Sequence, residues 1–336
     1  MSDAQDISQR NQIVDLMKGL AILLMLVGHT GISTDGFLYK FIYSFHMPLF
    51  FIIAGYYAKS IEETKRSYSQ TLWKDVKRLL VPYLLTAIAI ILFKAIQTII
   101  KHDISFVYER AIGLLYVTYD AGPIWFLVAL FLMRIFFRPL MRLSRWALPI
   151  SIVLSGLAIV IAHHLFQLPF CLLTAISLMV FYAIGWYYRR YGFPIWAIVL
   201  CLLCWPFVIY GPRIDLYYMR WGIYPLTVLG ACGGTYAIFA LCCGLYKVVN
   251  KQHKYIGQNL LQRTCNFIRW AGINSLIILC FHTFDMYCCW ITMLLKGLFN
   301  VELAYWPTQL LRDGMVLLLS WLYVSYIRQH IIILKK

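Results

Sequence analysis

Long apolar blocks alternate with short polar segments along most of this chain. Each block has close to the about 20 residues that an α-helix needs to cross roughly 30 Å of hydrocarbon. Open strands cannot satisfy their backbone groups in lipid, so blocks of this length favour helices. The pattern therefore predicts an all-α polytopic membrane protein, a bundle of about ten transmembrane helices. The ten predicted spans are 12–31, 41–58, 79–100, 122–139, 147–165, 170–188, 194–211, 223–246, 271–294 and 309–328.

Two stretches between the apolar blocks are too polar to cross a bilayer. We expect a longer loop at 101–121, with room for a short helix, and a basic connector at 247–270. No internal repeat and no low-complexity segment is visible, so we predict one domain over 1–336 with a short polar N-terminal tail, 1–11. The N-terminus lacks the basic region and small-residue cleavage site of a signal peptide, and we expect the first helix to be retained.

Composition excludes a soluble domain. Hydrophobic residues make up 62% of the chain and charged residues 13%, whereas soluble domains carry about 25% charged residues. Nearly all of the 10 cysteines lie inside apolar segments, where cysteine behaves as a small hydrophobic residue. The Cys201-x-x-Cys204 spacing is a weak redox or metal signal, and plain packing is the favoured interpretation.

The net charge of +16 indicates membrane topology and not nucleic-acid binding, because the basic residues lie in short loops between apolar blocks. With the N-terminus on the inside, 22 Lys and Arg residues fall on that side and 7 on the other. The positive-inside rule then predicts both termini in the cytoplasm. We expect a multi-pass protein of the inner (plasma) membrane.

Polar residues inside apolar spans are costly, which makes each one a functional candidate. Lys18 and His29 in the first span are 11 residues apart, about three turns and roughly 16 Å along a helix, so they share a face. A histidine in this setting suits proton transfer near neutral pH. The alternative is that Lys18 is an interfacial anchor and His29 an interfacial polar residue.

Two further histidines are expected toward the same outer side as His29. His46 begins the second span two residues before Pro48, where a purely interfacial role is the simpler explanation. His282 lies in the ninth span, and Asp285 follows three residues later on the same helix face, where it is placed to orient the imidazole. An acidic residue and a histidine within one turn of an apolar span favour function over packing.

The loop before the third span ends in three membrane-proximal basic residues, Lys74, Lys77 and Arg78. Taken alone, they are best explained as anchors to anionic lipid. They are equally able to hold the phosphates of a cytoplasmic donor.

Several phrases together resemble the membrane acyltransferase 3 family, over about residues 11–330 and in the family's order. Lys18 and His29 are similar to its basic-x10-His signature. The most specific phrase resembles its second helix, closest to the fucose 4-O-acetylase-like branch: Tyr43-Ser44-Phe45-His46-Met47-Pro48-Leu49-Phe50-Phe51. The remaining phrases resemble its fourth and late helices: Gly122-Pro123-Ile124-Trp125-Phe126-Leu127, and Asn274-Ser275-Leu276 with His282.

The resemblance implies transfer of an acyl group, usually acetyl from acetyl-CoA, to a hydroxyl of a sugar or other envelope molecule. It implies that His29 is the catalytic histidine, that Lys18 is its basic partner, and that the basic pair before the third helix binds phosphate. The sequence departs from the pattern at Asp75, where the family's Arg-x-x-Arg requires an arginine. Lys74, Lys77 and Arg78 are the substitutes, and lysine binds phosphate without the bidentate fork of arginine.

The sequence therefore favours a membrane-bound O-acyltransferase with acyl-CoA as donor and a sugar or glycan as acceptor. His29 either deprotonates the acceptor hydroxyl or accepts the acyl group transiently, and His282 and Asp285 assist at the catalytic centre. Candidates for substrate binding are His46, Trp125 and Asn274. The alternative is a transporter or flippase of envelope glycans or lipids. The histidines lack a close ligand spacing such as His-x-x-x-His, so we expect no metal site.

Overall fold

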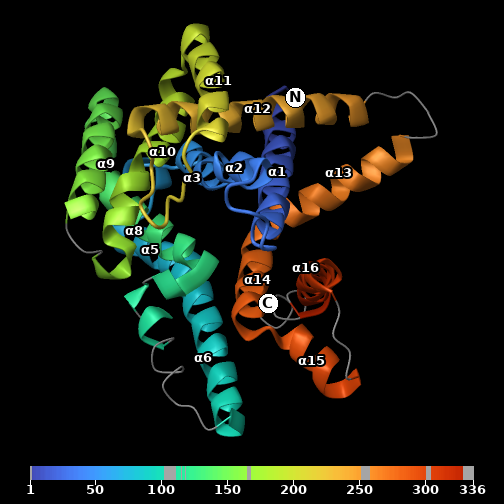
Figure 1. Cartoon of the computed structure of the whole chain (residues 1–336). Helices are drawn as coiled ribbons and strands as arrows, with labels where there is room; N and C mark the ends of the chain where they lie inside the picture. Colours follow the sequence, from blue (N-terminus) through green and yellow to red (C-terminus); the bar gives the residue numbers. More distant parts are fainter. Residues whose placement is uncertain are drawn as a thin grey trace. The chain divides into compact units, whose positions relative to one another are not determined.

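The computed structural model describes residues 2–101, 111–114, 116–117, 119–164, 168–250, 258–299 and 304–327. These residues form helices joined by short loops, and they contain no strand beyond one isolated bridge between Asp215 and Arg220 (Figure 1). The chain divides into two compact units. Unit 1 comprises Met1–Asp75 and Ala129–Ile273, and unit 2 comprises Val76–Val128 and Asn274–Lys336.

Apolar helices of membrane-spanning length confirm the prediction of an all-α polytopic membrane protein. Among the described residues, 7 helices are long and apolar enough to cross a membrane, or up to 8 if one bent pair is a single span. The 7 helices coincide with the predicted spans 41–58, 79–100, 122–139, 147–165, 170–188, 223–246 and 309–328. The first predicted block lies in α1 (Ser2–Gly28), and the block at 194–211 forms the shorter helix α11 (Ile195–Tyr210).

The predicted ninth span is interrupted, and this corrects the expectation of one helix over 271–294. Helix α13 (Gln258–Ile273) ends at the bend around Asn274, and α14 (Ser275–Cys288) begins after it. Asn274 has φ −105° and ψ 17°, which is outside the helical region. Much of the expected basic connector at 247–270 is therefore helical, while residues 251–257 lie outside the described part.

Unit 1 holds the helices that carry His29 and His46. Besides α1, α11 and α13 they are α2 (Phe37–Tyr43), α3 (His46–Tyr56), α4 (Ile61–Thr64), α5 (Tyr68–Asp75), most of α8 (Trp125–Met141), α9 (Ala147–His164), α10 (Leu172–Tyr191) and α12 (Tyr224–Asn250). Short 3-10 turns precede α9 and α10, at Ser144–Trp146 and Pro169–Cys171.

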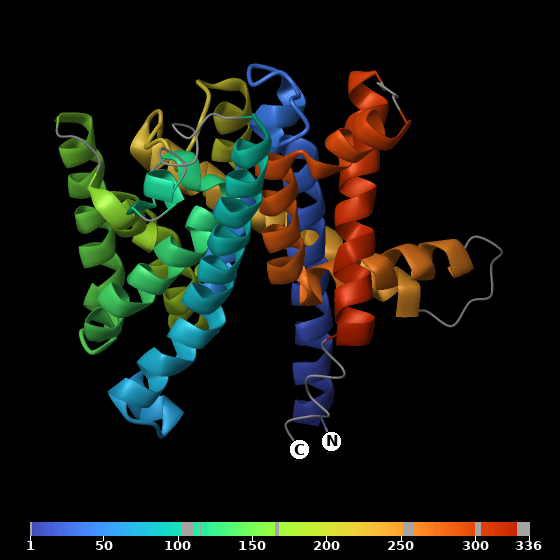
Figure 2. The same cartoon turned by 90° about the horizontal axis from the view of Figure 1, so that it is seen from below.

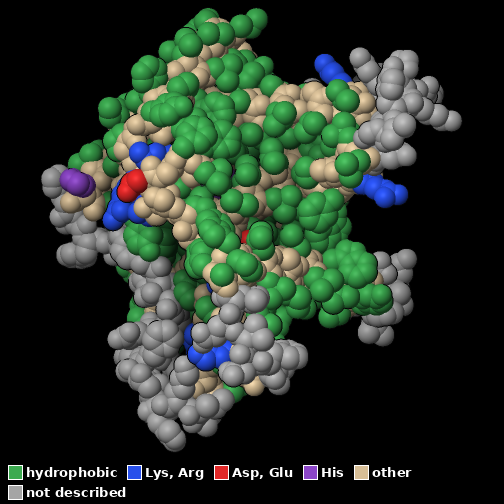
Figure 3. Space-filling model, turned by 45° about the vertical axis from the view of Figure 1, so that its right-hand side comes forward, with side chains coloured by type: hydrophobic (Ala, Val, Ile, Leu, Met, Phe, Trp, Pro, Cys, Tyr) green, Lys and Arg blue, Asp and Glu red, His purple; other side chains and the backbone are tan. Residues whose placement is uncertain are grey.

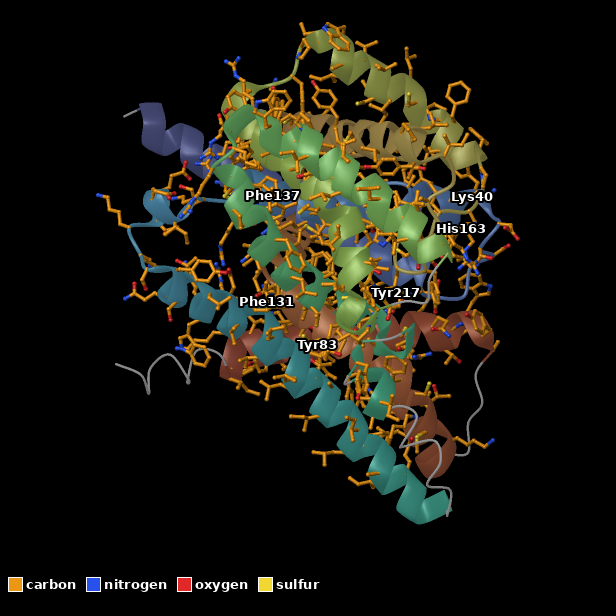
Figure 4. The ribbon with its side chains drawn as sticks, turned by 90° about the vertical axis from the view of Figure 1, so that its left-hand side faces the viewer. Lys40, Tyr83, Phe131, Phe137, His163 and Tyr217 are labelled. Carbon is orange, nitrogen blue, oxygen red and sulfur yellow. The ribbon has the colours of Figure 1, made fainter. Side chains whose placement is uncertain are left out.

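Glycines allow α3 and α10 of unit 1 to pack backbone against backbone. A Cβ atom at Gly185 would lie 1.9 Å from the carbonyl oxygen of Ile52, and one at Gly55 would lie 1.9 Å from that of Tyr182. Small residues that permit such close approach are typical of helix pairs in membranes. Next to this crossing, the buried ring of Phe137 on α8 packs edge-on against Tyr182, with centroids 5.2 Å apart (Figure 4).

Unit 2 holds the helices that carry His282. They are η1 (Val76–Leu80), α6 (Val81–Lys101), η2 (Tyr119–Ile124), the first turn of α8, α14, α15 (Trp290–Phe299), α16 (Tyr305–Leu322) and η5 (Tyr323–Ile327). In this unit α14 packs against both α6 and α16, and α16 is the red helix of Figure 2. Residues of α14 and α16 therefore meet, although they are well separated in sequence.

Large apolar side chains are exposed on many helices, as expected for a protein surrounded by lipid. Examples include Leu85 at 63%, Ile195 at 80% and Leu203 at 63% exposure. Among the coloured side chains in Figure 3, the hydrophobic ones cover much more of the face than the charged ones. A soluble protein rarely exposes apolar patches of this extent, so the surface agrees with the membrane assignment.

Candidate functional site

His29 lies one residue beyond the end of α1. Its backbone N–H donates to the carbonyl oxygens of Met25 at 3.1 Å and Leu26 at 3.0 Å, so the last turn of the helix fixes its position. The predicted first span therefore places His29 at the C-terminal end of α1, at the start of the short loop that leads into α2.

Tyr43 connects the two histidines of unit 1. Its ring meets His29 edge-on, with centroids 6.3 Å apart, and meets His46 edge-on, with centroids 4.8 Å apart. Tyr43 is the last residue of α2 and His46 the first of α3, so the break between these helices brings the three rings together. The expectation that His29 and His46 share one region is met within this unit.

The tautomer of His46 follows from its backbone partner. The Nδ1 atom of this buried ring lies 2.8 Å from the carbonyl oxygen of Ile42. A carbonyl oxygen can only accept, so Nδ1 carries the proton and donates it. The neutral ring then keeps the lone pair on Nε2, which is available to accept a proton from a hydroxyl group.

An arginine and an aspartate extend this cluster beyond Tyr43. The ring of Tyr39 stacks on Tyr43 with centroids 3.8 Å apart. The Nη2 atom of Arg213 lies 3.3 Å from the Tyr39 hydroxyl oxygen and 3.3 Å from Oδ2 of Asp215. Burial raises the pKa of the Asp215 carboxyl above its usual range, although the backbone N–H of Tyr218 and the charge of Arg213 oppose this shift.

We name His29, Tyr39, Tyr43, His46, Arg213 and Asp215 the outer cluster. Sequence reasoning identified only the two histidines as candidates. The spacing of Tyr39 and Tyr43, four residues apart on one helix, was a usable signal, because such residues share a helix face. Arg213 and Asp215 gave no such signal, since they come from a loop about 170 residues later in the chain and reach the cluster only through folding.

Lys18 forms an ion pair within its own helix. Its Nζ atom forms an ion pair with Oδ1 of Asp15, at 2.8 Å, one turn earlier on α1. Gly28 follows Lys18 by 10 residues, which is a rise of about 15 Å along the helix. Lys18 is therefore held at the opposite end of the apolar part of α1 from His29.

The three basic residues Lys74, Lys77 and Arg78 have exposed side chains. Between them, Asp75 is buried and bound by two arginines of α8. Its Oδ1 lies 2.5 Å from Nη1 of Arg134, and its Oδ2 contacts Nη2 of Arg138. The residue at which the sequence departs from the Arg-x-x-Arg pattern is thus the partner of an arginine pair that the sequence analysis did not identify.

In unit 2, α14 and α16 form a second polar cluster. Oδ2 of Asp285 lies 2.7 Å from Nε of Arg312, and the carbonyl oxygen of Asp285 accepts from Nη2 of the same guanidinium at 3.1 Å. A carboxylate near His282 is that of Asp313, whose Oδ1 lies 4.0 Å from Nδ1 of the ring. Arg312 holds Asp285, and the proposed role of Asp285 in orienting His282 stays a prediction. We name His282, Asp285, Arg312 and Asp313 the inner-helix cluster.

The remaining two candidates are buried in unit 2. Trp125 begins α8 and is 6% exposed, and Asn274 precedes α14 and is 4% exposed. Asn274 makes no side-chain cap bond to α14, although its carbonyl oxygen accepts from the N–H of Ile277 at 2.9 Å. Its observed contribution is to the bend between α13 and α14, and its substrate role stays a prediction.

Comparisons with known proteins identify the family of this chain. It is 29% identical over 163 residues to nodulation protein NolL of Mesorhizobium japonicum, an alignment that covers 45% of this chain and 42% of that protein. No solved structure matches the chain. The model of the acyltransferase domain family Acyl_transf_3 matches residues 11–325. Since that match covers nearly the whole chain, the protein belongs to the acyltransferase 3 family of membrane acyltransferases.

Proposed function

We propose that this protein is a membrane-bound O-acyltransferase. It transfers the acyl group of acyl-CoA, in this proposal acetyl, to a hydroxyl of a cell-envelope sugar or polysaccharide precursor. The observation that carries the proposal is the outer cluster, in which the Tyr43 ring lies against both His29 and His46. Family membership supplies the reaction class, and this cluster supplies the groups that can move a proton.

The chemistry requires a proton acceptor beside the acceptor hydroxyl. His29 takes the hydroxyl proton, the oxygen attacks the thioester carbonyl, the C–S bond breaks, and the CoA thiolate leaves and is protonated. In a second route a ring nitrogen of His29 attacks the thioester carbonyl, the C–S bond breaks, and the CoA thiolate leaves with the imidazole proton. The acceptor hydroxyl then attacks the acyl-imidazole, the C–N bond breaks, and the hydroxyl proton returns to the ring nitrogen. His46, with Nδ1 held by the carbonyl of Ile42, offers Nε2 for binding the acceptor hydroxyl.

The donor is proposed to approach from the cytoplasm. The exposed side chains of Lys74, Lys77 and Arg78 are suited to its phosphate groups. In this proposal the protein resides in the inner (plasma) membrane with both termini in the cytoplasm, as the distribution of Lys and Arg predicts.

A separate role is proposed for unit 2. His282, with Asp313 as its carboxylate neighbour, is the residue of this unit proposed to bind the acceptor. The resemblance of the second-helix phrase to the fucose 4-O-acetylase-like branch supports a sugar hydroxyl as the acceptor.

A transfer assay with a matched histidine control tests the proposal. Purified protein in nanodiscs is given labelled acetyl-CoA and an envelope-sugar fraction, and labelled ester and free thiol are both measured. We expect His29→Ala to abolish ester formation. His163→Ala, an exposed histidine at the end of α9 outside both clusters, is expected to retain it.

Two results would contradict the proposal. Unchanged ester formation in His29→Ala would remove His29 from the mechanism. Wild-type protein that consumes no thioester but moves a labelled glycan across a vesicle membrane would support the transporter alternative instead.

A further inference from the structure

Two arginines of α8 share one buried carboxylate in unit 1. Arg134 and Arg138 lie one turn apart and contact different oxygens of Asp75. The side chains of Arg134, Arg138 and Asp75 are 22%, 9% and 7% exposed. Two positive charges against one negative charge leave a net charge of +1 in a largely buried position, which is costly without a further anion.

The two arginines also have N–H donors that Asp75 does not accept from. Among the described residues, Nη1 of Arg138 and Nε of Arg134 are buried and have no hydrogen-bond partner. The side chain of Arg138 is more than nine-tenths buried, so bulk water does not solvate these N–H groups. Buried N–H groups of this kind are normally satisfied, which points to an acceptor that joins the pair.

The other carboxylates in the described segments beside the pair are already paired. Glu63 contacts Arg190, and Glu62 lies 3.9 Å from Arg142. The segments 57–75, 134–146 and 189–191 contain 10 Lys and Arg residues against 3 acidic residues. Within these segments no carboxylate is left for the arginine pair beyond Asp75, so the missing anion comes from a ligand.

We propose that Arg134 and Arg138 form a phosphate site for the acyl donor, and that Asp75 occupies this site as an internal counterion while the donor is absent. The two guanidinium groups donate N–H bonds to both oxygens of a carboxylate, and the same arrangement of donors can bind two phosphate oxygens. The part-exposed side chain of Arg134 gives the ligand an approach from the surface. The assignment of this phosphate to the donor rests on the proposed function.

The site explains why Asp75 stands where an arginine was expected. The positive charge lost at that position in the chain is supplied from α8, and Asp75 holds the two guanidinium groups in place until phosphate arrives. Phosphate either displaces the Asp75 carboxylate or binds beside it on the two guanidinium groups, so the buried net charge falls when the donor binds.

Binding of CoA to the full-length protein in zwitterionic nanodiscs tests the site. Asp75→Asn removes the competing carboxylate at nearly constant shape, and we expect CoA and inorganic pyrophosphate to bind about tenfold more tightly. Arg138→Lys keeps the charge but removes the fork, and we expect binding about tenfold weaker. Arg134→Gln leaves the buried pair between Asp75 and Arg138 intact, and it is expected to weaken binding by a similar factor.

Arg142→Gln is the matched control. Arg142 follows α8 by one residue and pairs with Glu62, yet its side chain is 75% exposed. We expect CoA affinity within about twofold of wild type, because exposed ion pairs contribute little. Thermal unfolding of each variant identifies any that fails to fold, and Arg134→Gln, the least buried substitution, then still decides the outcome.

Three results would overturn the site. The first is unchanged CoA affinity in Arg134→Gln and Arg138→Lys. The second is Asp75→Asn protein that folds and binds CoA no more tightly than wild type. The third is an effect of the arginine variants on anionic-lipid binding in phosphatidylglycerol nanodiscs but not on CoA, which would assign the site to a lipid headgroup.

The same measurements separate this inference from the proposed function. If acetyl transfer depends on His29 but CoA affinity is unchanged in the Arg134 and Arg138 variants, the phosphate site fails and the transferase proposal survives. If pyrophosphate affinity follows Asp75 and the arginines while no acyl transfer occurs, the site survives and the transferase proposal fails.

Discussion

The ring of Tyr43 meets the ring of His46 edge-on, with centroids 4.8 Å apart and the two planes inclined by 70°. The ring of Tyr43 also meets that of His29 edge-on. One aromatic side chain therefore limits the orientations of both imidazoles. This arrangement makes Tyr43 a positioning residue for the proposed reaction, distinct from the groups that move protons.

Replacing Tyr43 should separate positioning from proton transfer. Tyr43→Ala removes the ring, so both imidazoles gain freedom, and we expect kcat to fall about 100-fold with a smaller change in KM for acetyl-CoA. Tyr43→Phe keeps the edge contacts and should retain most of the activity. Steady-state transfer assays measure both constants, and equal losses in the two variants would assign the role to the hydroxyl group instead.

The crossing of α3 and α10 should not tolerate a methyl group. In Gly185→Ala the new Cβ would meet the carbonyl oxygen of Ile52 at 1.9 Å, so the helices must separate, and we expect a loss of about 3 kcal/mol or more of unfolding free energy. Gly244→Ala on α12 is the control, because its Cβ meets nothing within 4 Å. That change should be neutral or stabilise by up to about 1 kcal/mol. Unfolding in detergent monitored by tryptophan fluorescence measures both, and similar values would contradict the packing argument.

Hydropathy along the chain predicted the architecture well, for a physical reason. Lipid leaves a spanning segment only the helix, so an apolar block such as 170–188 determines its own structure, here α10. The bend at Asn274 escaped prediction because the residues on both of its sides are apolar enough to continue one helix. Composition carries no signal for a backbone break of this kind.

The polar partners were predictable only in part. His29 and His46 were found because a histidine is unusual in an apolar block. Asp285 was matched with His282 because the two are close in sequence, whereas its partner Arg312 reaches it from a helix 27 residues away and could not be predicted. Likewise, Asp75 signalled only a departure from a motif until folding placed Arg134 and Arg138 beside it.

Breaking the ion pair in the inner-helix cluster should destabilise unit 2. In Asp285→Asn the partly buried guanidinium of Arg312 loses its charged partner at the buried Asp285 position, and we expect a loss of about 3 kcal/mol of unfolding free energy. Glu62→Gln, which breaks an exposed contact with Arg142, should cause no measurable change. Chemical denaturation of the purified proteins compares the two, and an unaffected Asp285→Asn protein would show that the pair is not structural.

The raised pKa of Asp215 should give the outer cluster a pH-dependent stability. Because burial makes the folded state hold the carboxyl proton more tightly than the unfolded chain, stability falls as pH rises through the ordinary value of 3.8 toward the raised pKa. Above that range the penalty of the buried charge is fully present and constant. Asp215→Asn lacks the titrating group, so the difference in melting temperature, variant minus wild type, should increase from pH 4 upward and then level off. Thermal unfolding between pH 4 and pH 8 in one detergent measures this difference. A difference that is flat across the range, or that decreases with pH, would mean that Arg213 and the Tyr218 N–H outweigh burial and lower the pKa of Asp215.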